Sequence, residues 1–356
     1  MCRLENRDME SSKIKRELTR LCLQVTTYFP KLFPASVRGK VKMLWNSLQY
    51  EEGLAVAVPP RSCRCGATLL DLSMTSGFGE TVHPDVIYVP EGLGPDGWKY
   101  LMTVTPFPKA IVYFENPEFL VSHDGLSWSL PPGGKSPVVA PPSDWTGYNS
   151  DPALFYENGE IFLIYREVRE EKGCLLISVY IMKTRDGITW SVPKVMRSLK
   201  SPANRAGVLM SPSVLKLDGK YYVWYVDEDA GVFQVKRAEC PGMSSIADGV
   251  TAELHGMPEG LTPWHIDIEP DEERLLMALC AKDRCGRHSI LFAESFDLGW
   301  NWQIIENKRL DPIRESGEES LYKAALTKDS ERGWKLYYSY KDDEGHWYTV
   351  MEKMEL

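Results

Sequence analysis

No run of apolar residues in the 356-residue sequence approaches the roughly 20 that a membrane-spanning helix needs. The first residues, Met1 to Glu5, hold no apolar core of the kind that a Sec-type export signal requires. Lysine and arginine form no long run outside the N-terminal region, and the net charge is −9. We therefore expect no membrane span, no nucleic-acid partner, and a cytoplasmic protein, or a virion component if a phage encodes it.

The cysteines lack the spacing of common zinc sites. Eight of them lie at positions 2, 22, 63, 65, 174, 240, 280 and 285. Cys63 and Cys65 could join Cys280 and Cys285 in a four-thiolate zinc site, but neither pair has the usual C-x2-C spacing. Without an export signal the default is reduced thiols. We expect free cysteines, no metal ligands and no cofactor, with a central Ca²⁺ or other cation as the open alternative.

Aromatic side chains are plentiful: 11 Trp and 17 Tyr, in a chain that is 43% hydrophobic and 26% charged. The overall proportions are those of an ordinary soluble globular protein. Aromatics at this density favour β-structure and also suit sugar-binding surfaces. We expect a β-rich fold in which sheet packing accounts for more of these rings than ligand contact does.

The N-terminal region differs from the rest of the chain. Residues 12–48 carry basic and apolar residues at mixed helical spacing, and Pro30 and Pro34 divide them into two helices. We expect residues 1–62 to form a short α-helical segment and residues 63–356 to form the main domain. The helical segment could dock a protein partner or cap the larger domain, and docking is the interpretation that we favour.

From about residue 66, short strands bounded by Gly, Pro, Asn and Asp form a repeat. Five similar segments begin at His83, Asp151, Ser211, His265 and Glu319, at separations of 68, 60, 54 and 54 residues. A turn and a second apolar strand follow each one. Units of this size suit four antiparallel strands apiece, which predicts an all-β fold, a five-bladed β-propeller. The last repeat has room for three strands, so residues 67–72 are expected to supply its fourth.

Three turns share a second pattern. Asp124-Gly125 and Asp186-Gly187 are each followed by a Trp three residues after the Gly, and Asp297 belongs to a version that is one residue longer. These turns resemble the Asp-box turns of sialidases and related propellers. In such a turn the Asp accepts backbone N–H groups and the Gly takes a positive φ, while the Trp packs between blades. We interpret them as architecture rather than chemistry.

Propeller topology predicts which residues meet at the central funnel. The first strand of each blade starts near one mouth, the second ends there and the third begins there. Asp267 follows His265 by two residues and shares its strand face. Buried charges are costly without partners, so the residues at the mouth should pair with one another or meet a ligand. The predicted set is His83, Thr105, Glu115, Asn116, Asp151, Arg166, Glu167, Ser211, Asp227, Glu228, His265, Asp267 and Tyr322.

The layout resembles the five-bladed propellers of family-43 glycoside hydrolases, with kinship to the family-32 and sialidase-like groups, over residues 70–356. In that family a first-blade Asp acts as base, a second-blade Asp orients and a third-blade Glu is the acid. Here only the second position matches, as Asp151-Pro152, whereas the other two are His83-Pro84 and Ser211-Pro212. The family's inverting mechanism therefore does not carry over.

The chain resembles more closely a poorly characterised group of glycosidase-like proteins from bacteria and phage particles. The shared features are His83-Pro84, Glu115-Asn116-Pro117, Asp151-Pro152, Tyr165-Arg166 and the run Trp264-His265-Ile266-Asp267. This resemblance implies a carbohydrate partner at the funnel.

Two functional hypotheses follow. The first is an O-glycosidase acting on a polysaccharide or oligosaccharide, with Asp151, Glu115 and Asp267 as catalytic carboxylates, because such cleavage needs one protonated and one ionised carboxyl. The second is a non-catalytic glycan-binding or virion-assembly module, which the loss of two catalytic positions favours. A purely structural interaction propeller is a third interpretation. Substrate contacts would come from His83, Asn116, Arg166, Glu167, Ser211, Trp264, His265 and Tyr322, with Trp145, Tyr148 and Trp224 as further candidates for stacking on sugars.

Overall fold

The structure is a computed structural model. It describes residues 63–64, 66–142, 147–328 and 333–356, together with positions 15, 17–25, 37, 40, 41, 44, 45 and 48. Residues 17–25 are helical. The predicted boundary at residue 62 and the predicted docking role fall largely on residues outside this set and stay predictions. Within the described set, no helix is long and apolar enough to cross a membrane.

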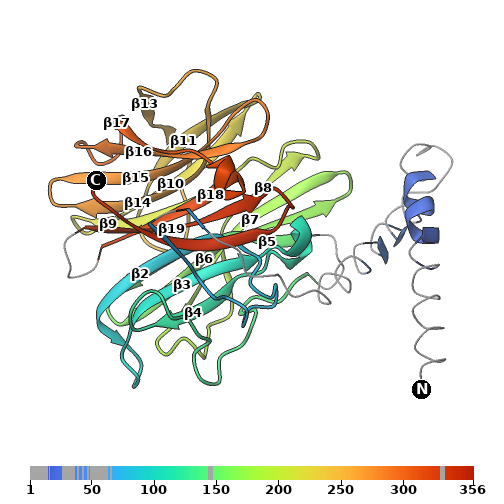
Figure 1. The fold of residues 1–356 in the computed structure, drawn as a ribbon, viewed down its shortest axis with the longest axis horizontal. Helices are drawn as coiled ribbons and strands as arrows, with labels where there is room; N and C mark the ends of the chain where they lie inside the picture. Colours follow the sequence, from blue (N-terminus) through green and yellow to red (C-terminus); the bar gives the residue numbers. More distant parts are fainter. Residues whose placement is uncertain are drawn as a thin grey trace.

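The main domain consists of five sheets (Figure 1). The first contains β2 (Thr81–Leu93), β3 (Trp98–Pro106) and β4 (Glu118–Ser122). The second contains β5 (Gly147–Glu157), β6 (Glu160–Glu171), β7 (Cys174–Thr184) and β8 (Lys194–Pro202). The third contains β9 (Met210–Leu217), β10 (Lys220–Asp229), β11 (Val232–Cys240) and β12 (Val250–Thr251).

The remaining two sheets each include a strand from elsewhere in the chain. The fourth contains β14 (Thr262–Asp271), β15 (Arg274–Lys282), β16 (His288–Ser295) and β17 (Asn301–Leu310), with β13 (Glu253–His255) parallel to β17. The fifth contains β18 (Glu318–Thr327), β19 (Trp334–Asp342), β20 (Trp347–Met354) and β1 (Ala67–Leu69). Three short 3-10 helices complete the described elements: η2 (Pro108–Ala110), η3 (Val112–Phe114) and η4 (Arg314–Ser316).

The sheets surround one axis, each as a blade of a propeller. The first strands contact one another in the order β2, β5, β9, β14 and β18, and β18 contacts β2 again. In Figure 1 the red strands β18 and β19 accordingly lie beside the cyan β2. The propeller predicted from the repeat is confirmed.

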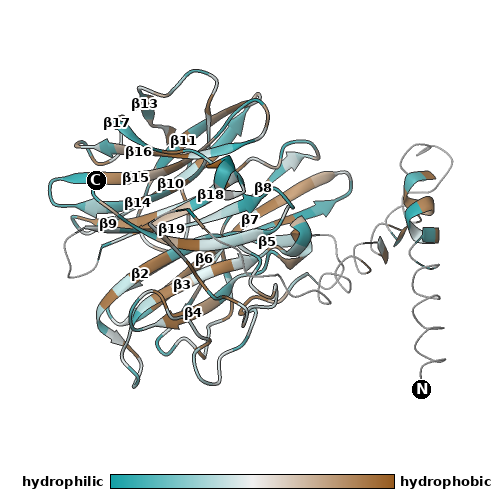
Figure 2. Cartoon of the chain, viewed as in Figure 1, coloured by the Kyte–Doolittle hydropathy of each residue, from teal (hydrophilic) through white to brown (hydrophobic). Residues whose placement is uncertain are grey.

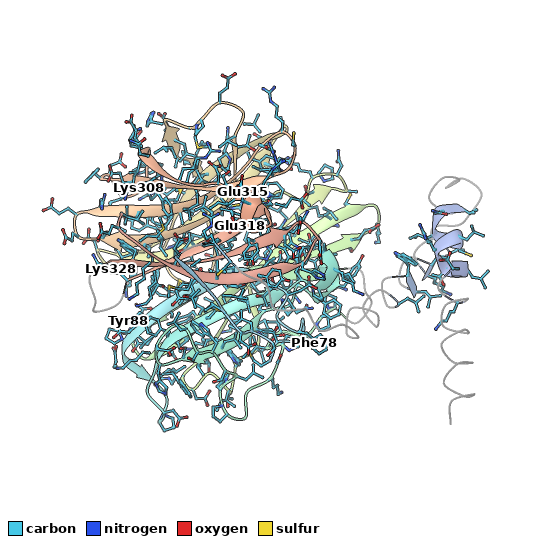
Figure 3. All side chains as sticks on the ribbon, viewed as in Figure 1. Phe78, Tyr88, Lys308, Glu315, Glu318 and Lys328 are labelled. Carbon is cyan, nitrogen blue, oxygen red and sulfur yellow. The ribbon has the colours of Figure 1, made fainter. Side chains whose placement is uncertain are left out.

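The ring closes by means of a strand that precedes the first blade. β1 runs antiparallel to β20, with Ala67 opposite Glu352 and Leu69 opposite Val350, so the predicted origin of this strand is also confirmed. Just before β1, the guanidinium of Arg64 forms a buried ion pair with Glu318, the first residue of β18 and labelled in Figure 3. The start of the domain is thereby fixed to its last blade.

The hydrophobic core is divided among the seams between blades. Five clusters of buried apolar side chains each join two neighbouring blades, and the ring of seams includes the closing seam between blades five and one. Figure 2 shows the corresponding hydrophobic segments along the strands, for example on β3 and β6. Trp224, a predicted sugar-stacking residue, is instead completely buried between blades three and four, where its Nε1 donates to the Gly299 carbonyl oxygen at 3.3 Å.

The three Asp turns have the expected local geometry. The Asp124 carboxylate accepts the backbone N–H groups of Leu126 and Ser127 at 2.8 and 2.7 Å, and Asp186 and Asp297 cap their turns in the same way. Gly299 has a φ of 78°, and a Cβ there would lie 2.5 Å from Nε1 of Trp224. These turns hold neighbouring blades together, and their residues are not part of the site at the funnel.

The buried ion pair at the closing seam yields a stability prediction. We expect Glu318→Ala to destabilise the fold by about 3–5 kcal/mol, because it leaves the Arg64 guanidinium buried without its partner. Thermal melting should show a Tm lower by roughly 5–10 °C.

The matched control is Glu319→Ala, which removes an exposed carboxylate that pairs with Lys341 and should change stability by at most about 0.5 kcal/mol. Replacing both partners by apolar residues (Arg64→Met with Glu318→Leu) should recover much of the loss. A Tm of Glu318→Ala equal to that of the wild type would show that this pair does not hold the seam.

Candidate active site

Three of the first strands contain the same strained backbone feature. His83, Asp151 and Ser211 have φ values of 56, 50 and 48°. Each precedes a proline, which normally drives the preceding residue to an extended conformation. Such a conformation costs on the order of 1–3 kcal/mol for a residue other than Gly. The strand pairing also shifts register at His83 and at Asp151, and irregularities of this kind redirect side chains.

The redirected side chains meet the histidine of blade four. The Asp151 Oδ1 atom lies 3.6 Å from His83 Nε2 and 3.2 Å from His265 Nδ1. All three residues are buried. Each offers one potential ligand atom, and these three atoms lie within 4.8 Å of one another. Among the described residues, this is the group of His, Cys, Asp or Glu side chains that could share a metal ion.

The hydrogen bonds of His83 determine which of its ring nitrogens carries the proton. Thr105 donates its hydroxyl to the Val82 carbonyl oxygen at 3.3 Å, so its oxygen accepts from His83 Nδ1 at 2.9 Å. His83 Nε2 is then unprotonated, buried and without a hydrogen-bond partner. Burial lowers the pKa of His83 well below its usual value, so the ring is neutral near pH 7.

His265 is held by two side chains through one nitrogen. Its Nδ1 lies 2.6 Å from Ser211 Oγ and 3.2 Å from Asp151 Oδ1, whereas its Nε2 is buried and unpartnered. Burial lowers the pKa of His265 as well. The predicted substrate contact Ser211 is 1% exposed, so its hydroxyl positions His265 and does not face solvent.

Arg166 serves to position Asp151. Its guanidinium donates to Asp151 Oδ2 at 3.3 Å and to the carbonyl oxygens of Val208 and Ala206, just before β9. Burial would raise the pKa of Asp151, but hydrogen bonding from His265 and the nearby positive charges outweigh it and lower that pKa. Of the groups that contact Asp151, Arg166 is the one that carries a permanent positive charge. Of its two predicted roles, the structure supports holding a carboxylate rather than clamping a sugar.

Glu115 is the second carboxyl group of the site. It follows η3, and its Oε2 lies 3.6 Å from His83 Nδ1. Burial and the negative charge of Asp151 raise the pKa of Glu115 well above its usual value. The site therefore combines an ionised carboxylate with a carboxyl group that tends to keep its proton.

Aromatic rings form one wall of the site. The Tyr322 ring lies 5.2 Å from that of His83, 4.7 Å from that of His265 and 5.1 Å from that of His288. The indole Nε1 of Trp264 donates to the Tyr322 hydroxyl at 3.3 Å, which leaves that hydroxyl able to donate its own proton. The Lys282 ammonium lies 3.3 Å from the centre of the Trp264 ring, so one predicted stacking face is already covered.

Asp267 does not lie with the predicted catalytic carboxylates. Its Oδ2 accepts the backbone N–H of Leu326 in blade five at 2.7 Å. Asp85 Oδ2 accepts the N–H of Leu154 in blade two at 2.6 Å, and Ser213 Oγ accepts that of Ile268 in blade four at 3.1 Å. Each of these residues lies two positions after a funnel residue, and each joins its blade to the next. The Asp267 carboxylate therefore links blade four to blade five, and its predicted catalytic role stays a prediction.

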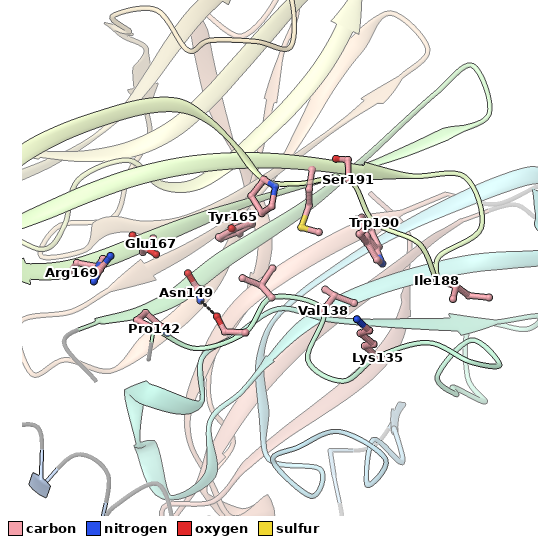
Figure 4. Close-up of a pocket in the computed structure, with 14 residues that line it drawn as sticks. Lys135, Val138, Pro142, Asn149, Tyr165, Glu167, Arg169, Ile188, Trp190 and Ser191 are labelled. Atoms are coloured by element: carbon pink, nitrogen blue, oxygen red, sulfur yellow. Dashed lines mark hydrogen bonds between the residues drawn. The ribbon is translucent and has the colours of Figure 1, made fainter. Parts of the chain in front are cut away.

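Glu167 and Asn116 also differ from their predicted positions. Glu167 alternates with Arg166 along β6 and lines a separate cleft between blades one and two (Figure 4). Asn116 is buried and accepts from Asn149 Nδ2 at 2.8 Å, so it holds the two blades together. Tyr148 packs in the seam between blades two and three, and Trp145 lies outside the described residues.

Two buried residues near the site were not predicted from the sequence. Lys323 donates to the Pro152 carbonyl oxygen at 3.0 Å and lies 3.5 Å from Asp85 Oδ1. His288 begins β16, and its Nε2 is buried without a hydrogen-bond partner. The sequence feature that could have predicted Lys323 is its position directly after Tyr322 in the fifth repeat. His288 begins a third strand, a position that the topology also brings to the mouth.

No family model matches the chain. A curated relative, the A type blood N-acetyl-α-D-galactosamine deacetylase of Flavonifractor plautii, is 24% identical over 272 residues, 65% of this chain. The chain spans only 35% of the length of that relative.

Solved structures of similar fold belong to two kinds of protein. An N-acetylgalactosamine deacetylase from F. plautii, in complex with blood group B trisaccharide, has a TM-score of 0.67 at 18% identity, covering 83% of this chain and 93% of that one. A xylan β-1,4-xylosidase from Bacillus halodurans has a TM-score of 0.56 at 15% identity, covering 78% and 53%. A family-43 enzyme from Xanthomonas citri has a TM-score of 0.52 at 12% identity, covering 81% and 91%. The chain therefore has the propeller fold that these proteins share.

The buried histidine beside Tyr322 yields a pH prediction. Burial, reinforced by His265, lowers the pKa of His288 to about 3. Below about pH 6.5 the unfolded chain takes up a proton at this residue that the native state does not, so stability is lost as the pH falls from about 6.5 towards 3. As the pH falls from 7.5 to 5, the free energy of unfolding of His288→Asn should rise relative to that of wild type by on the order of 2 kcal/mol. Urea unfolding of both proteins at both pH values measures this change. A difference in unfolding free energy between variant and wild type that is equal at the two pH values would contradict the prediction.

Proposed function

We propose that this chain is a metal-assisted hydrolase that removes an N-acetyl group from an amino sugar of a glycan. The observation that carries the proposal is the cluster of His83, Asp151 and His265, whose potential ligand atoms lie within 4.8 Å of one another. The Nε2 atoms of both histidines are buried without hydrogen-bond partners. An unsatisfied buried polar atom is costly, and a bound cation would remove that cost.

The donor set fits a divalent cation. Two neutral imidazoles and an ionised carboxylate are ligands that zinc and similar metals accept, and three protein ligands leave positions open for water and substrate. A divalent cation held there would act as a Lewis acid towards the carbonyl oxygen of the acetamide. The Thr105 hydroxyl fixes the tautomer of His83, as residues behind metal-binding histidines commonly do.

The other residues of the site have roles that follow from their positions. In the hydrolysis, the oxygen of water adds to the acetyl carbon, the C–N bond breaks, and the nitrogen takes a proton to leave a free amine and acetate. Glu115, next to His83, is placed to carry that proton. Arg166 holds Asp151, and the Tyr322 hydroxyl can donate to an oxygen in the funnel.

The comparisons support an acetyl-removing enzyme over a glycosidase. The curated relative and the structure with a TM-score of 0.67 are both named as deacetylases, whereas the family-43 enzymes described above have scores of 0.56 and 0.52. The family-43 base and acid positions are occupied by His83 and Ser211, neither of which is a carboxylate. Asp151 also contacts both histidines and Arg166.

The first test measures metal content and acetate release together. We expect the purified protein to contain about one divalent metal per chain by elemental analysis, and to release acetate from glycans that end in N-acetylgalactosamine. A chelator should stop the release and added metal should restore it. Asp151→Asn and His265→Gln should lower both metal content and activity, whereas His123→Gln, a change at an exposed histidine stacked on Trp98, should lower neither. Full acetate release without metal would refute the proposal.

Glycosidic cleavage is the second candidate function. It is favoured by one observation, the raised pKa of Glu115 beside the lowered pKa of Asp151, because a glycosidase divides the acid and base roles between two such carboxyl groups. This reaction releases a new reducing sugar, whereas deacetylation releases acetate.

Glu115→Gln separates the two reactions. In either case we expect a loss of about 10²–10⁴ in kcat. If Glu115 protonates a glycosidic oxygen, Glu115→Gln should cleave aryl glycosides with highly acidic leaving groups at close to the wild-type rate, because such leaving groups depart without protonation. If it protonates the nitrogen that leaves the acetyl group of an N-acetyl sugar, neither the wild type nor the variant should release an aglycone from aryl glycosides. Glycan binding without release of acetate or of a new reducing sugar would instead support a non-catalytic binding module.

A further inference from the structure

A cleft of about 570 Å³ lies beside the funnel, between the chain segment 135–142 and blade two. Figure 4 shows Glu167 and Arg169 towards one end of this cleft, Tyr165 in the middle and Trp190 towards the other. Asn149 and Lys135 also line it. Its volume lies within the range of about 300–1,000 Å³ that small-ligand sites occupy.

The cleft and the candidate active site lie on opposite faces of one wall. Successive side chains of a strand alternate between its faces. Arg166 therefore reaches the funnel, whereas Tyr165, Glu167 and Arg169 line the cleft. On β5, the backbone N–H of Asn149 donates to the Glu115 carbonyl oxygen at 2.8 Å. A ligand in the cleft would thus lie next to the strands that carry Asp151 and Arg166.

The lining provides hydrogen-bonding groups and an aromatic ring. Asn149 donates its Nδ2 to Asn116 Oδ1 at 2.8 Å and to the Ala140 carbonyl oxygen at 3.3 Å, but its Oδ1 is buried and has no hydrogen-bond partner. An unpaired buried acceptor of this kind is uncommon in a folded protein. The ring of Trp190 is fixed by its bond to the Gly187 carbonyl oxygen and by an edge contact with Phe119, and it is only partly buried.

We propose that this cleft binds the part of a glycan that extends beyond the reacting sugar. A carboxylate and a guanidinium in a cleft with an aromatic ring match the hydroxyl groups and apolar faces of a saccharide. A peptide that adds a strand needs an unpaired strand edge, and β6 is paired on both sides, with β5 and β7. The class of ligand rests on the proposed function, whereas the location rests on the cleft.

The test compares the binding of two glycans in the presence of a chelator, under which the proposed hydrolysis stops. The probes are a disaccharide and a pentasaccharide that share the same terminal N-acetylgalactosamine. We expect wild type to bind the pentasaccharide at least tenfold more tightly by calorimetry, because charged hydrogen bonds add to its affinity. Glu167→Gln should reduce this advantage to threefold or less. Glu171→Gln on the same strand, where the carboxylate pairs with Lys200, is the matched control and should keep it.

A second measurement locates the bound chain. In spectra of protein with ¹⁵N-labelled tryptophan, the indole signal of Trp190, assigned with Trp190→Phe, should shift with the pentasaccharide and stay in place with the disaccharide. Equal affinities for the two glycans, or an unchanged advantage in Glu167→Gln, would overturn the cleft proposal. Acetate release after metal is restored to the same protein would then show that the proposed function stands without the cleft, and its absence would remove the proposed function separately.

Discussion

Closure of the ring is the constraint on which the rest of this structure depends. The residues of the candidate site are distant in sequence, and they meet because β2, β5, β9, β14 and β18 surround one axis. That ring is completed by the pairing of β1 with β20 and by the Arg64–Glu318 ion pair. Since each seam has its own apolar cluster, opening one seam would separate blades and increase the distances among His83, Asp151 and His265.

The buried polar groups of the first strands form two sets. The first set holds His83, Asp151 and His265, with nitrogen atoms that lack partners. The second set holds Asp85, Asp267 and Lys323, whose polar groups are used for contacts between blades. Burial of polar groups is tolerated in the second set because they are paired and hydrogen-bonded there. The first set is incompletely satisfied, which is why we place the proposed chemistry in it.

The sequence predicted the fold well because a propeller repeats itself. The spacing of His83, Asp151, Ser211 and His265 identified the first strands, and the shortage of one strand in the last blade identified the role of residues 67–72. Position along the strands also predicted that His83, Asp151 and His265 lie together, as they do. It did not predict that Glu167 lines a separate cleft or that the Asp267 carboxylate accepts a backbone N–H of blade five. Side-chain direction depends on bulges at His83 and Asp151 and on alternation along β6, and the repeat does not encode these details.

The positive φ of His83, Asp151 and Ser211 restricts how a protein of this kind can change its chemistry. Each position must accept a left-handed backbone before proline, which Asp, Asn and His tolerate better than most side chains and which β-branched residues resist. Exchange among residues that tolerate this backbone, such as Asp, Asn and His, is therefore the accessible route by which such a funnel could change its chemistry. The backbone that aims the side chains would be left unaltered by that route.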